Sequence, residues 1–181
     1  EEMSGDIDAG LAEADVLVEG EYTLPSRHHN PMEPSVTIAA WSGDHLTMHT
    51  ATQWTYGVRY ALAPLLGLPP ANIRVVCPFT GGGFGCKGWV WPHQIIAAVA
   101  AREIGRPLKL VLSRAQMYTD TGYQPAMRNS IAIGAKRDGR LTAIRHETIN
   151  VTSGFEDHIE HGVHGPRGLF AAPHRQFVIT V

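Results

Sequence analysis

Alternating hydrophobic and polar residues in the first part of the chain predict strands joined by short turns. Residues 8–14 have the pattern of a short helix, and residues 16–24 alternate as a strand does. Residues 35–41 and 46–49 also alternate, on either side of a Ser-Gly-Asp turn at residues 42–44 that is typical of a hairpin. Three prolines interrupt the stretch before this hairpin and predict an irregular loop: Pro25, Pro31 and Pro34.

Two helices are predicted in the middle of the chain, each ended by a glycine. Apolar residues recur at helical spacing over residues 53–66, and Gly67 stands where this helix would stop. Residues 72–77 form a short, almost continuous apolar run that predicts a buried strand. A second helix is predicted over residues 89–104, because a proline is tolerated in its first turn and Gly105 follows its last position.

The last third of the chain has the pattern of strands and loops. Residues 108–112 predict another buried strand. Residues 128–136 and 141–151 predict a hairpin, because an Asp-Gly turn separates them. Residues 153–175 are rich in glycine and histidine and predict irregular structure, whereas residues 176–181 have the pattern of a strand.

The order of these elements predicts the fold class. Strands and helices alternate over residues 46–112, which is typical of a mixed α/β layer. The hairpins on either side of that region make the whole chain α+β. We expect a ligand at the loop ends of the central strands.

Composition and charge exclude several classes of protein. The 181 residues are 44% hydrophobic and 18% charged, as in a globular domain, with a net charge of −2. No basic stripe indicates nucleic-acid binding, and no apolar run is long enough to cross a bilayer. Cys77 and Cys86 lie nine positions apart without a C-x-x-C pair, so they predict free thiols and not a zinc site.

Residues 81–88 are the densest run of glycine and lie between a predicted strand and a predicted helix. Four of the first five residues of this run are glycine. Glycine permits positive φ and lets a ligand approach the backbone without meeting a Cβ. Successive N–H groups in such a turn converge on an anion, and a helix N-terminus behind it adds a positive dipole end. The run therefore predicts a site for a phosphate, an oxyanion or a metal-oxo group.

Other interpretations compete for the same run. Residues 83–88 match G-x-G-x-x-G, and Arg114 follows the next strand, where the 2′-phosphate of NADP would be held. An NADP-binding Rossmann-type module is therefore an alternative, although residues 78–80 and two further glycines separate the match from its strand. The Walker-type phosphate loop fails, because Cys86 replaces its second glycine and Gly88 its magnesium-binding hydroxyl. A glycine-rich bend made only for close packing is the simplest interpretation.

Polar residues next to the predicted helix 53–66 form a second candidate motif. Thr52 is placed to cap the helix, and Gln53 would lie in its first turn with its amide directed into a cleft. Taken alone, the pair is explained by capping and a solvated amide.

The histidines and carboxylates do not define a metal or acid–base site by spacing. His28, His29 and Glu33 lie in a loop stiffened by prolines, which favours a hydrogen-bonded loop over a metal site. Histidine recurs every third residue at 158, 161 and 164, but the glycines there argue against a chelating helix. No spacing singles out a pair among the candidate acid–base groups, which are Glu33, Glu156, Asp157 and Glu160.

Three motifs in order, at residues 31–34, 50–53 and 80–87, together resemble the molybdopterin-binding subunit of the xanthine dehydrogenase and aldehyde oxidase family. Residues 89–93 and 105–109 fit the same family. The resemblance implies that residues 1–181 are the N-terminal part of the molybdenum-cofactor domain, with a linker-like lead-in before the first strand. Because the family's subunit is several times longer, we expect a fragment truncated at both ends.

The resemblance implies a molybdopterin-dependent oxidoreductase that hydroxylates aldehydes or N-heterocycles with water as the oxygen source. Electrons would pass to a 2Fe–2S subunit and an FAD subunit. Gln53 would hydrogen-bond an oxo ligand of molybdenum. The residues that would line the cofactor with their backbone are Gly82, Gly83, Phe84 and Gly85. The catalytic base is expected downstream of Val181, so we expect the isolated fragment to be inactive.

Departures from the family pattern bear on the substrate. Purine-oxidising members carry a glutamate directly after the lysine of the glycine run, whereas here Gly88 follows Lys87. A purine would lose a hydrogen-bonding partner, which favours aldehydes. Cys86 and Gly88 resemble the bacterial aldehyde-oxidising branch, whose cofactor is usually the cytosine dinucleotide form. A non-catalytic domain derived from such an enzyme is a further alternative, and the compartment, cytoplasm or periplasm, stays open.

Overall fold

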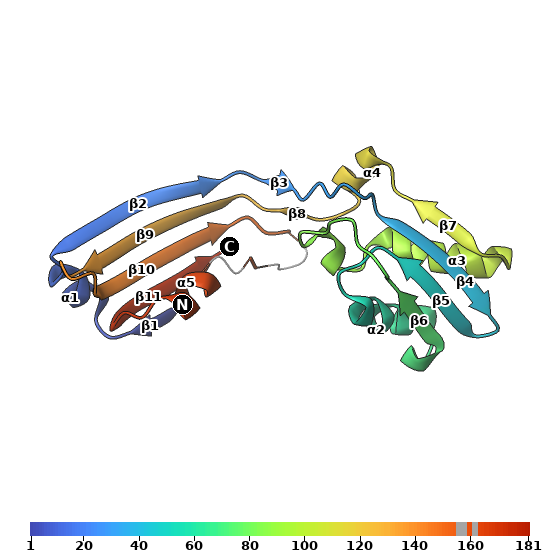
Figure 1. Ribbon diagram of the computed structural model, residues 1–181, viewed down its shortest axis with the longest axis horizontal. Coiled ribbons are helices and arrows are strands. Elements are labelled where there is room, and N and C mark those ends of the chain that lie inside the picture. Colours follow the sequence, from blue (N-terminus) through green and yellow to red (C-terminus); the bar gives the residue numbers. More distant parts are fainter. Residues whose placement is uncertain (155–158, 161–162) are drawn as a thin grey trace. The chain divides into compact units, whose positions relative to one another are not determined.

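The computed structural model of the chain divides into two compact units (Figure 1). Unit 1 comprises Glu1–Arg27 and Pro125–Val181, and unit 2 comprises His28–Gln124. The structure describes residues 1–154, 159–160 and 163–181. Two short strands, β3 (Arg27–His28) and β8 (Tyr123–Gln124), pair in a two-stranded sheet.

Unit 1 is built on a five-stranded sheet with the strand order β1-β11-β10-β9-β2 (Figure 1). Its strands are β1 (Glu2–Ser4), β2 (Val16–Leu24), β9 (Met127–Ala135), β10 (Leu141–Asn150) and β11 (His174–Thr180). β9 and β10 form the hairpin that the Asp-Gly turn predicted, and β2 pairs with β9 in antiparallel register. β10 and β11 run parallel. The connection between them contains the short helix α5 (His164–Leu169), where irregular structure was expected.

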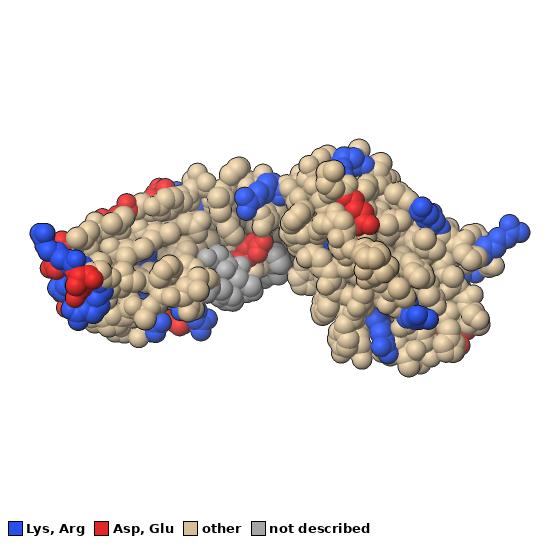
Figure 2. Space-filling view, in the orientation of Figure 1, with Lys and Arg blue, Asp and Glu red and all other residues tan. Residues whose placement is uncertain are grey.

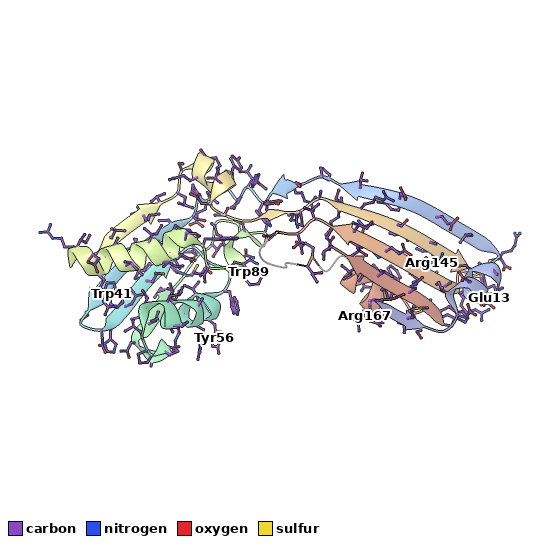
Figure 3. All side chains as sticks on the ribbon, turned by 180° about the vertical axis from the view of Figure 1, so that it is seen from behind. Glu13, Trp41, Tyr56, Trp89, Arg145 and Arg167 are labelled. Atoms are coloured by element: carbon purple, nitrogen blue, oxygen red, sulfur yellow. The ribbon has the colours of Figure 1, made fainter. Side chains whose placement is uncertain are left out.

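The first fifteen residues contain one strand and one helix of unit 1. β1 pairs with β11, and α1 (Ile7–Ala12) packs against β10 and β11. Asp6 caps α1 by accepting from the N–H of Ala9 at 3.0 Å. Arg145 of β10, labelled in Figure 3, forms an ion pair with Asp8 at 2.6 Å. The helix predicted at residues 8–14 is therefore present as α1, and because so short a helix is marginal alone, it depends on these tertiary contacts.

Unit 2 is built on a mixed four-stranded sheet with the strand order β6-β5-β4-β7. Its strands are β4 (Val36–Ser42), β5 (His45–Thr50), β6 (Ile73–Val76) and β7 (Leu108–Val111). β4 and β5 form the predicted hairpin, β7 pairs antiparallel with β4, and β6 runs parallel to β5. Short 3₁₀ helices, η1 (Pro70–Asn72) and η2 (Cys86–Gly88), lie beside β6 and before the next helix.

Two helices cover one face of this sheet. α2 (Thr55–Leu66) and α3 (Pro92–Ile104) bury their apolar residues against the side chains of β4 and β5. The shared core contains Ala39, Leu46, Met48, Val58, Leu62, Ala97 and Ala98. Both helices end as predicted, because Gly67 and Gly105 adopt φ of 66° and 62°, a left-handed conformation that glycine takes at little cost. The two-layer packing confirms the α+β class.

Trp41 of β4 makes two contacts with α3. Its indole Nε1 donates to the carbonyl of Ala98 at 2.8 Å, and the guanidinium of Arg102 lies 4.8 Å from the ring centroid. Figure 3 labels Trp41 on the sheet beside this helix. Because Ala98 and Arg102 lie in successive turns of α3, these two contacts fix the orientation of the helix relative to β4.

Two helix starts differ from the sequence prediction. α2 begins at Thr55, two residues later than predicted, because the N–H of Gln53 donates to the carbonyl of Lys87 at 2.8 Å instead of facing a helical turn. α3 begins at Pro92, three residues later than predicted, because the backbone of Trp89 and Trp91 is extended. A further helix, α4 (Arg114–Thr119), was not predicted and is capped by Ser113, which accepts from the N–H of Gln116 at 3.2 Å.

Charged residues are dispersed over the visible face of unit 2, and blue and red patches do not merge into one area (Figure 2). Within the described part of the chain, none of the helices combines the length and the apolar character that a membrane span requires.

Candidate functional site

Gln53 and the glycine loop, defined as residues 81–87, meet in unit 2 although they are far apart in the sequence. Gln53 lies in the connection between β5 and α2, and the loop follows β6. The Oε1 of Gln53 accepts from the N–H of Gly85 at 3.0 Å and from the N–H of Lys87 at 3.2 Å. The structure therefore brings together the two motifs that sequence analysis singled out.

These contacts decide which way the Gln53 amide faces. Two backbone donors require an oxygen acceptor, so the carbonyl end of the side chain points into the loop. The NH₂ group, Nε2, is then left as a donor on an exposed side chain, and it has no partner among the described residues. Gln53 thus presents two N–H bonds next to the glycine loop.

The backbone of the loop offers further donors. Among the described residues, the N–H groups of Gly82, Gly83 and Phe84 donate to no protein acceptor, in contrast to those of Gly81 and Gly85. Phe84 has a φ of 54°, a left-handed conformation that costs a non-glycine residue about 1–2 kcal/mol. Its side chain is 69% exposed, so burial of the ring does not explain this strain. Strain of this kind clusters at ligand sites.

Gly83 permits the close approach of Gln53. A Cβ built on Gly83 would overlap with the Oε1 and Cδ of Gln53. Gly83 is buried, whereas Gly88 in the same run has open space around an added Cβ. The φ of Gly83 lies outside the left-handed region, so the approach of Gln53, whose hydrogen bonds hold it in place, explains the glycine here.

Thr52 does not cap α2, in contrast to the sequence prediction. Its Oγ1 donates to the carbonyl of Lys87 at 3.1 Å and accepts from the N–H of Trp54 at 3.1 Å. Trp54 is the residue at the N-cap and makes no side-chain cap. The hydrogen bond from Thr52 to Lys87 instead connects the residue before Gln53 to the end of the glycine loop.

Cys77 and Thr80 also contact the residue before Gln53, through the carbonyl of Thr52. Both cysteines are free thiols as predicted, but Cys77 is not inert packing. Its Sγ lies 3.3 Å from the carbonyl of Thr52 and 3.1 Å from the Oγ1 of Thr80. Thr80 Oγ1 also donates to the carbonyl of Thr52 at 3.1 Å. These contacts join residues 25–28 positions apart, so no local pattern predicts them.

An ion pair joins Lys87, the last residue of the glycine loop, to Glu33, and it was not predicted from the sequence. Lys87 Nζ is 2.7 Å from Glu33 Oε2, and the lysine side chain is 1% exposed. Burial by itself raises the pKa of Glu33, but the hydrogen bonds from Lys87 and from the Gly81 N–H outweigh it and hold that pKa below its ordinary value. Glu33, a candidate acid–base group by sequence, is therefore an ionised structural partner.

Arg114 binds the proline-rich loop and not a nucleotide phosphate. Its Nη1 donates to Asn30 Oδ1 at 3.1 Å and to the carbonyl of Pro31 at 2.7 Å, and its Nη2 donates to the carbonyl of Met32 at 2.9 Å. These three bonds occupy the guanidinium and fix the loop that carries Glu33. The same loop holds His28, whose ring lies 5.0 Å from that of Tyr118.

The Rossmann interpretation of residues 83–88 is wrong. The dinucleotide fingerprint turns directly from a strand into a helix. Here β6 ends at Val76, Gly88 lies in η2, and α3 begins only at Pro92. The sheet also contains antiparallel neighbours, so it is not a doubly wound sheet.

The described residues hold no cluster of three side chains that would bind a metal ion directly. Of the histidine series, His158 and His161 lie outside the described residues. His93, which sequence analysis passed over, is 4% exposed at the start of α3. Neither of its ring nitrogens has a described hydrogen-bond partner, and burial lowers its pKa to about 4, against an opposing effect of Asp120.

Comparison with known proteins places the chain in a family. Residues 1–172 match the molybdopterin cofactor-binding domain family. The chain is 38% identical over 144 residues to the aldehyde oxidoreductase molybdenum-binding subunit PaoC of Escherichia coli K12, which is 80% of this chain and 20% of that protein. It is 32% identical over 157 residues to a putative xanthine dehydrogenase molybdenum-binding subunit, XdhA, of the same organism, which is 86% of this chain and 21% of that protein.

A solved structure has the same fold. The aldehyde oxidoreductase of Desulfovibrio gigas superposes with a TM-score of 0.72 at 31% identity, covering 82% of this chain and 16% of that one. The chain thus spans about a fifth of the length of the curated relatives named above. On the family match and these relatives together, the chain belongs to the molybdopterin cofactor-binding domain family, within the molybdenum-binding subunits of the xanthine dehydrogenase and aldehyde oxidase type.

Proposed function

We propose that unit 2 binds the molybdenum–molybdopterin cofactor of a hydroxylase through Gln53 and the backbone of residues 82–85. The observation that carries the proposal is the double acceptance by Gln53 Oε1 from Gly85 and Lys87, which leaves the Gln53 amide as a donor. This amide and the N–H groups of Gly82, Gly83 and Phe84 form a set of neutral donors. Such a set suits a ligand that presents oxygen atoms with partial negative charge.

The residues present fit the cofactor that the family implies. Its metal is carried by the pterin, so the protein would hold it through hydrogen bonds to the ligand and not through metal-ligating side chains. Gly83 keeps a Cβ out of the cradle, and Gly82 and Gly85 take positive φ, as a loop that exposes its N–H groups requires. When bound, the cofactor supplies the redox chemistry of hydroxylation.

The chain's own contribution is to bind and orient. The Gln53 amide would donate to an oxygen of the cofactor, and the free N–H groups of residues 82–84 would bind it as well. Phe84, whose side chain is 69% exposed, would shield the bound group from water. None of these residues has an ionisable side chain, so we assign the catalytic base to the rest of the subunit.

The complete protein, in this proposal, is an aldehyde-oxidising or N-heterocycle-oxidising enzyme that uses water as the oxygen source. Its similarity to molybdenum-binding subunits supports a complex with other subunits. We infer that these are a 2Fe–2S subunit and an FAD subunit that receive the electrons. Gly88 in place of a glutamate favours aldehydes over purines, and we propose the cytosine dinucleotide form of the cofactor.

The test is metal and nucleotide analysis of the complete subunit, expressed with its neighbouring subunits. We expect stoichiometric molybdenum and the release of CMP after acid treatment. Molybdenum without CMP would support the site and contradict the dinucleotide form. A well-folded complex that contains no molybdenum under conditions that load a related enzyme would overturn the proposal.

A further inference from the structure

One carboxylate oxygen joins the two ends of the glycine loop. Glu33 Oε2 accepts from the N–H of Gly81 at 2.8 Å and from Nζ of Lys87 at 2.7 Å. The N–H of Glu33 donates in turn to the carbonyl of Gly81 at 3.1 Å. We propose that Glu33 and Lys87 are a positioning pair that holds the glycine loop in the shape in which it orients the Gln53 amide, an inference that rests on the proposed function.

The pair acts on Gln53 through the backbone of Lys87. The N–H of Lys87 donates to Gln53 Oε1 at 3.2 Å, and its carbonyl accepts from the N–H of Gln53 at 2.8 Å. The same carbonyl accepts from Thr52 Oγ1 at 3.1 Å. Lys87 thus holds both the side chain and the main chain of the Gln53 segment. A shift of its backbone would therefore turn the amide away from the site.

Burial makes the ion pair obligatory for the local fold. The side chain of Lys87 is 1% exposed and that of Glu33 is 34% exposed, so the ammonium group has little access to water. A buried charge that loses its partner is strongly destabilising, because nothing else compensates its desolvation. The lowered pKa of Glu33, in which the bonds from Lys87 and Gly81 outweigh the effect of burial, agrees with a carboxylate that stays ionised.

The absence of a side chain at Gly81 allows the close approach of Glu33. A Cβ built on Gly81 would lie 2.6 Å from the Cβ of Glu33, closer than two carbons can approach. Its φ lies outside the left-handed region, so backbone freedom does not account for the glycine. Gly81 is therefore explained by the approach of Glu33 to the start of the loop.

Neither Glu33 nor Lys87 is assigned a catalytic role, because their charged groups face each other. They act on the cofactor only through the loop and Gln53. A substitution of either residue should consequently change how well bound cofactor works, and not only how much is bound. This difference separates a positioning pair from a merely structural one.

The experiment uses the complete enzyme with Glu33→Gln, Lys87→Met and the double variant, since both replacements nearly preserve side-chain volume. For each variant we would measure molybdenum content, and kcat and KM with an aldehyde, with kcat expressed per bound molybdenum. Hydrogen exchange of the amides of Gly85 and Lys87 would be followed on cofactor-free protein. Glu21→Gln is the matched control, because it breaks an exposed ion pair with Arg128 in unit 1.

We expect each single variant to lower kcat per molybdenum by about tenfold to a hundredfold with little change in KM, the size of effect typical of a misplaced catalytic geometry. The double variant should be no worse than the poorer single variant, because the two residues act as a unit. The amides of Gly85 and Lys87 should exchange faster, since they lose the ordered Gln53 acceptor. Glu21→Gln should behave as the unmodified protein does.

The proposal is overturned if the single variants keep the unmodified kcat per molybdenum, even when they bind less cofactor, or if the Gly85 and Lys87 amides keep their protection. It is also overturned if the effects of the two substitutions simply add. Failure of the proposed function looks different: the unmodified enzyme itself would contain no molybdenum. The exchange measurement needs no cofactor, so it still decides whether the pair holds Gln53.

Discussion

Gln53 and Gly83 approach so closely that the side-chain oxygen of the glutamine occupies the place where a Cβ of residue 83 would lie. Thirty positions separate the two residues in the sequence, and the contact forms only because the glycine loop folds back over the start of α2. Any side chain at position 83 would therefore displace Gln53 from its hydrogen bonds with Gly85 and Lys87. The contact also makes the site sensitive to a single methyl group.

Gly83→Ala should therefore displace Gln53 and loosen the loop. Overpacking of this kind typically costs about 1–3 kcal/mol. We expect a lower thermal unfolding midpoint and reduced molybdenum content in the complete subunit. Gly88→Ala is the control for stability, because an added Cβ there meets nothing within 4 Å. Equal behaviour of the two alanine variants would contradict the packing argument.

Gln53→Glu should keep the acceptor and remove the donor. A carboxylate still accepts from Gly85 and Lys87, but it places a negative charge where the amide presented its N–H bonds. We expect the molybdenum content, or kcat per molybdenum, to fall by about tenfold or more, since a hydrogen bond to a charged group contributes about 1.5–3 kcal/mol.

Gln116→Glu is the matched control for that change. The Oε1 of Gln116 likewise accepts a backbone N–H, from Ser113 at 2.8 Å, but it lies in the first turn of α4. The control should keep full molybdenum content. If both glutamate variants lost it equally, the effect would come from added charge and not from the position of Gln53.

Arg114→Lys should loosen the loop that carries Glu33. A lysine cannot reproduce the fork that reaches Asn30, Pro31 and Met32 together. Loss of two of these bonds should destabilise the protein by about 1–3 kcal/mol, measured as a lower thermal unfolding midpoint. Arg106→Lys, at an exposed position, should have almost no effect. An unchanged midpoint for Arg114→Lys would show that the hydrogen bonds of Arg114 to residues 30–32 do not contribute to stability.

His93 should make the protein less stable in acid. Burial lowers its pKa to about 4 in the folded protein, whereas the ordinary value is 6.5. The unfolded chain therefore takes up a proton between these values and the folded chain does not, so the free energy of unfolding falls as the pH falls from 6.5 to about 4. The full effect is about 3 kcal/mol.

His93→Leu should remove this contribution. Unfolding in urea at several pH values between neutrality and about pH 4 would compare the two proteins. We expect the variant to lose less stability than the unmodified protein over that interval, by the amount that one proton accounts for. Identical pH dependence in the two proteins would show that His93 does not titrate differently on folding.

Much of the secondary structure follows from local pattern. Local signals predicted β2, β4 and β10 within one residue at each end, and the ends of α2 and α3 were predicted from Gly67 and Gly105. These signals succeed because a buried face imposes a period and a left-handed C-cap favours glycine. The motifs at residues 31–34, 50–53 and 80–87 were sufficient to indicate the family.

Local pattern failed where an element depends on distant partners. β1 has only three residues and was not predicted, because its pairing with β11 decides whether it forms. Gln53 was predicted in the first turn of α2, but its N–H bonds to Lys87 instead. A hydrogen bond across more than thirty residues leaves no periodic trace in the sequence.

The sequence by itself determined the strands and helices with a strong period, the glycine-rich composition of the loop and the family to which the chain belongs. Only the tertiary structure decided that Glu33, Gln53 and the glycine loop meet, which end of the Gln53 amide faces outward, and that Lys87 is buried against a carboxylate. The physical reason is that periodicity records which face of an element is buried. It does not record which distant residue packs against that face.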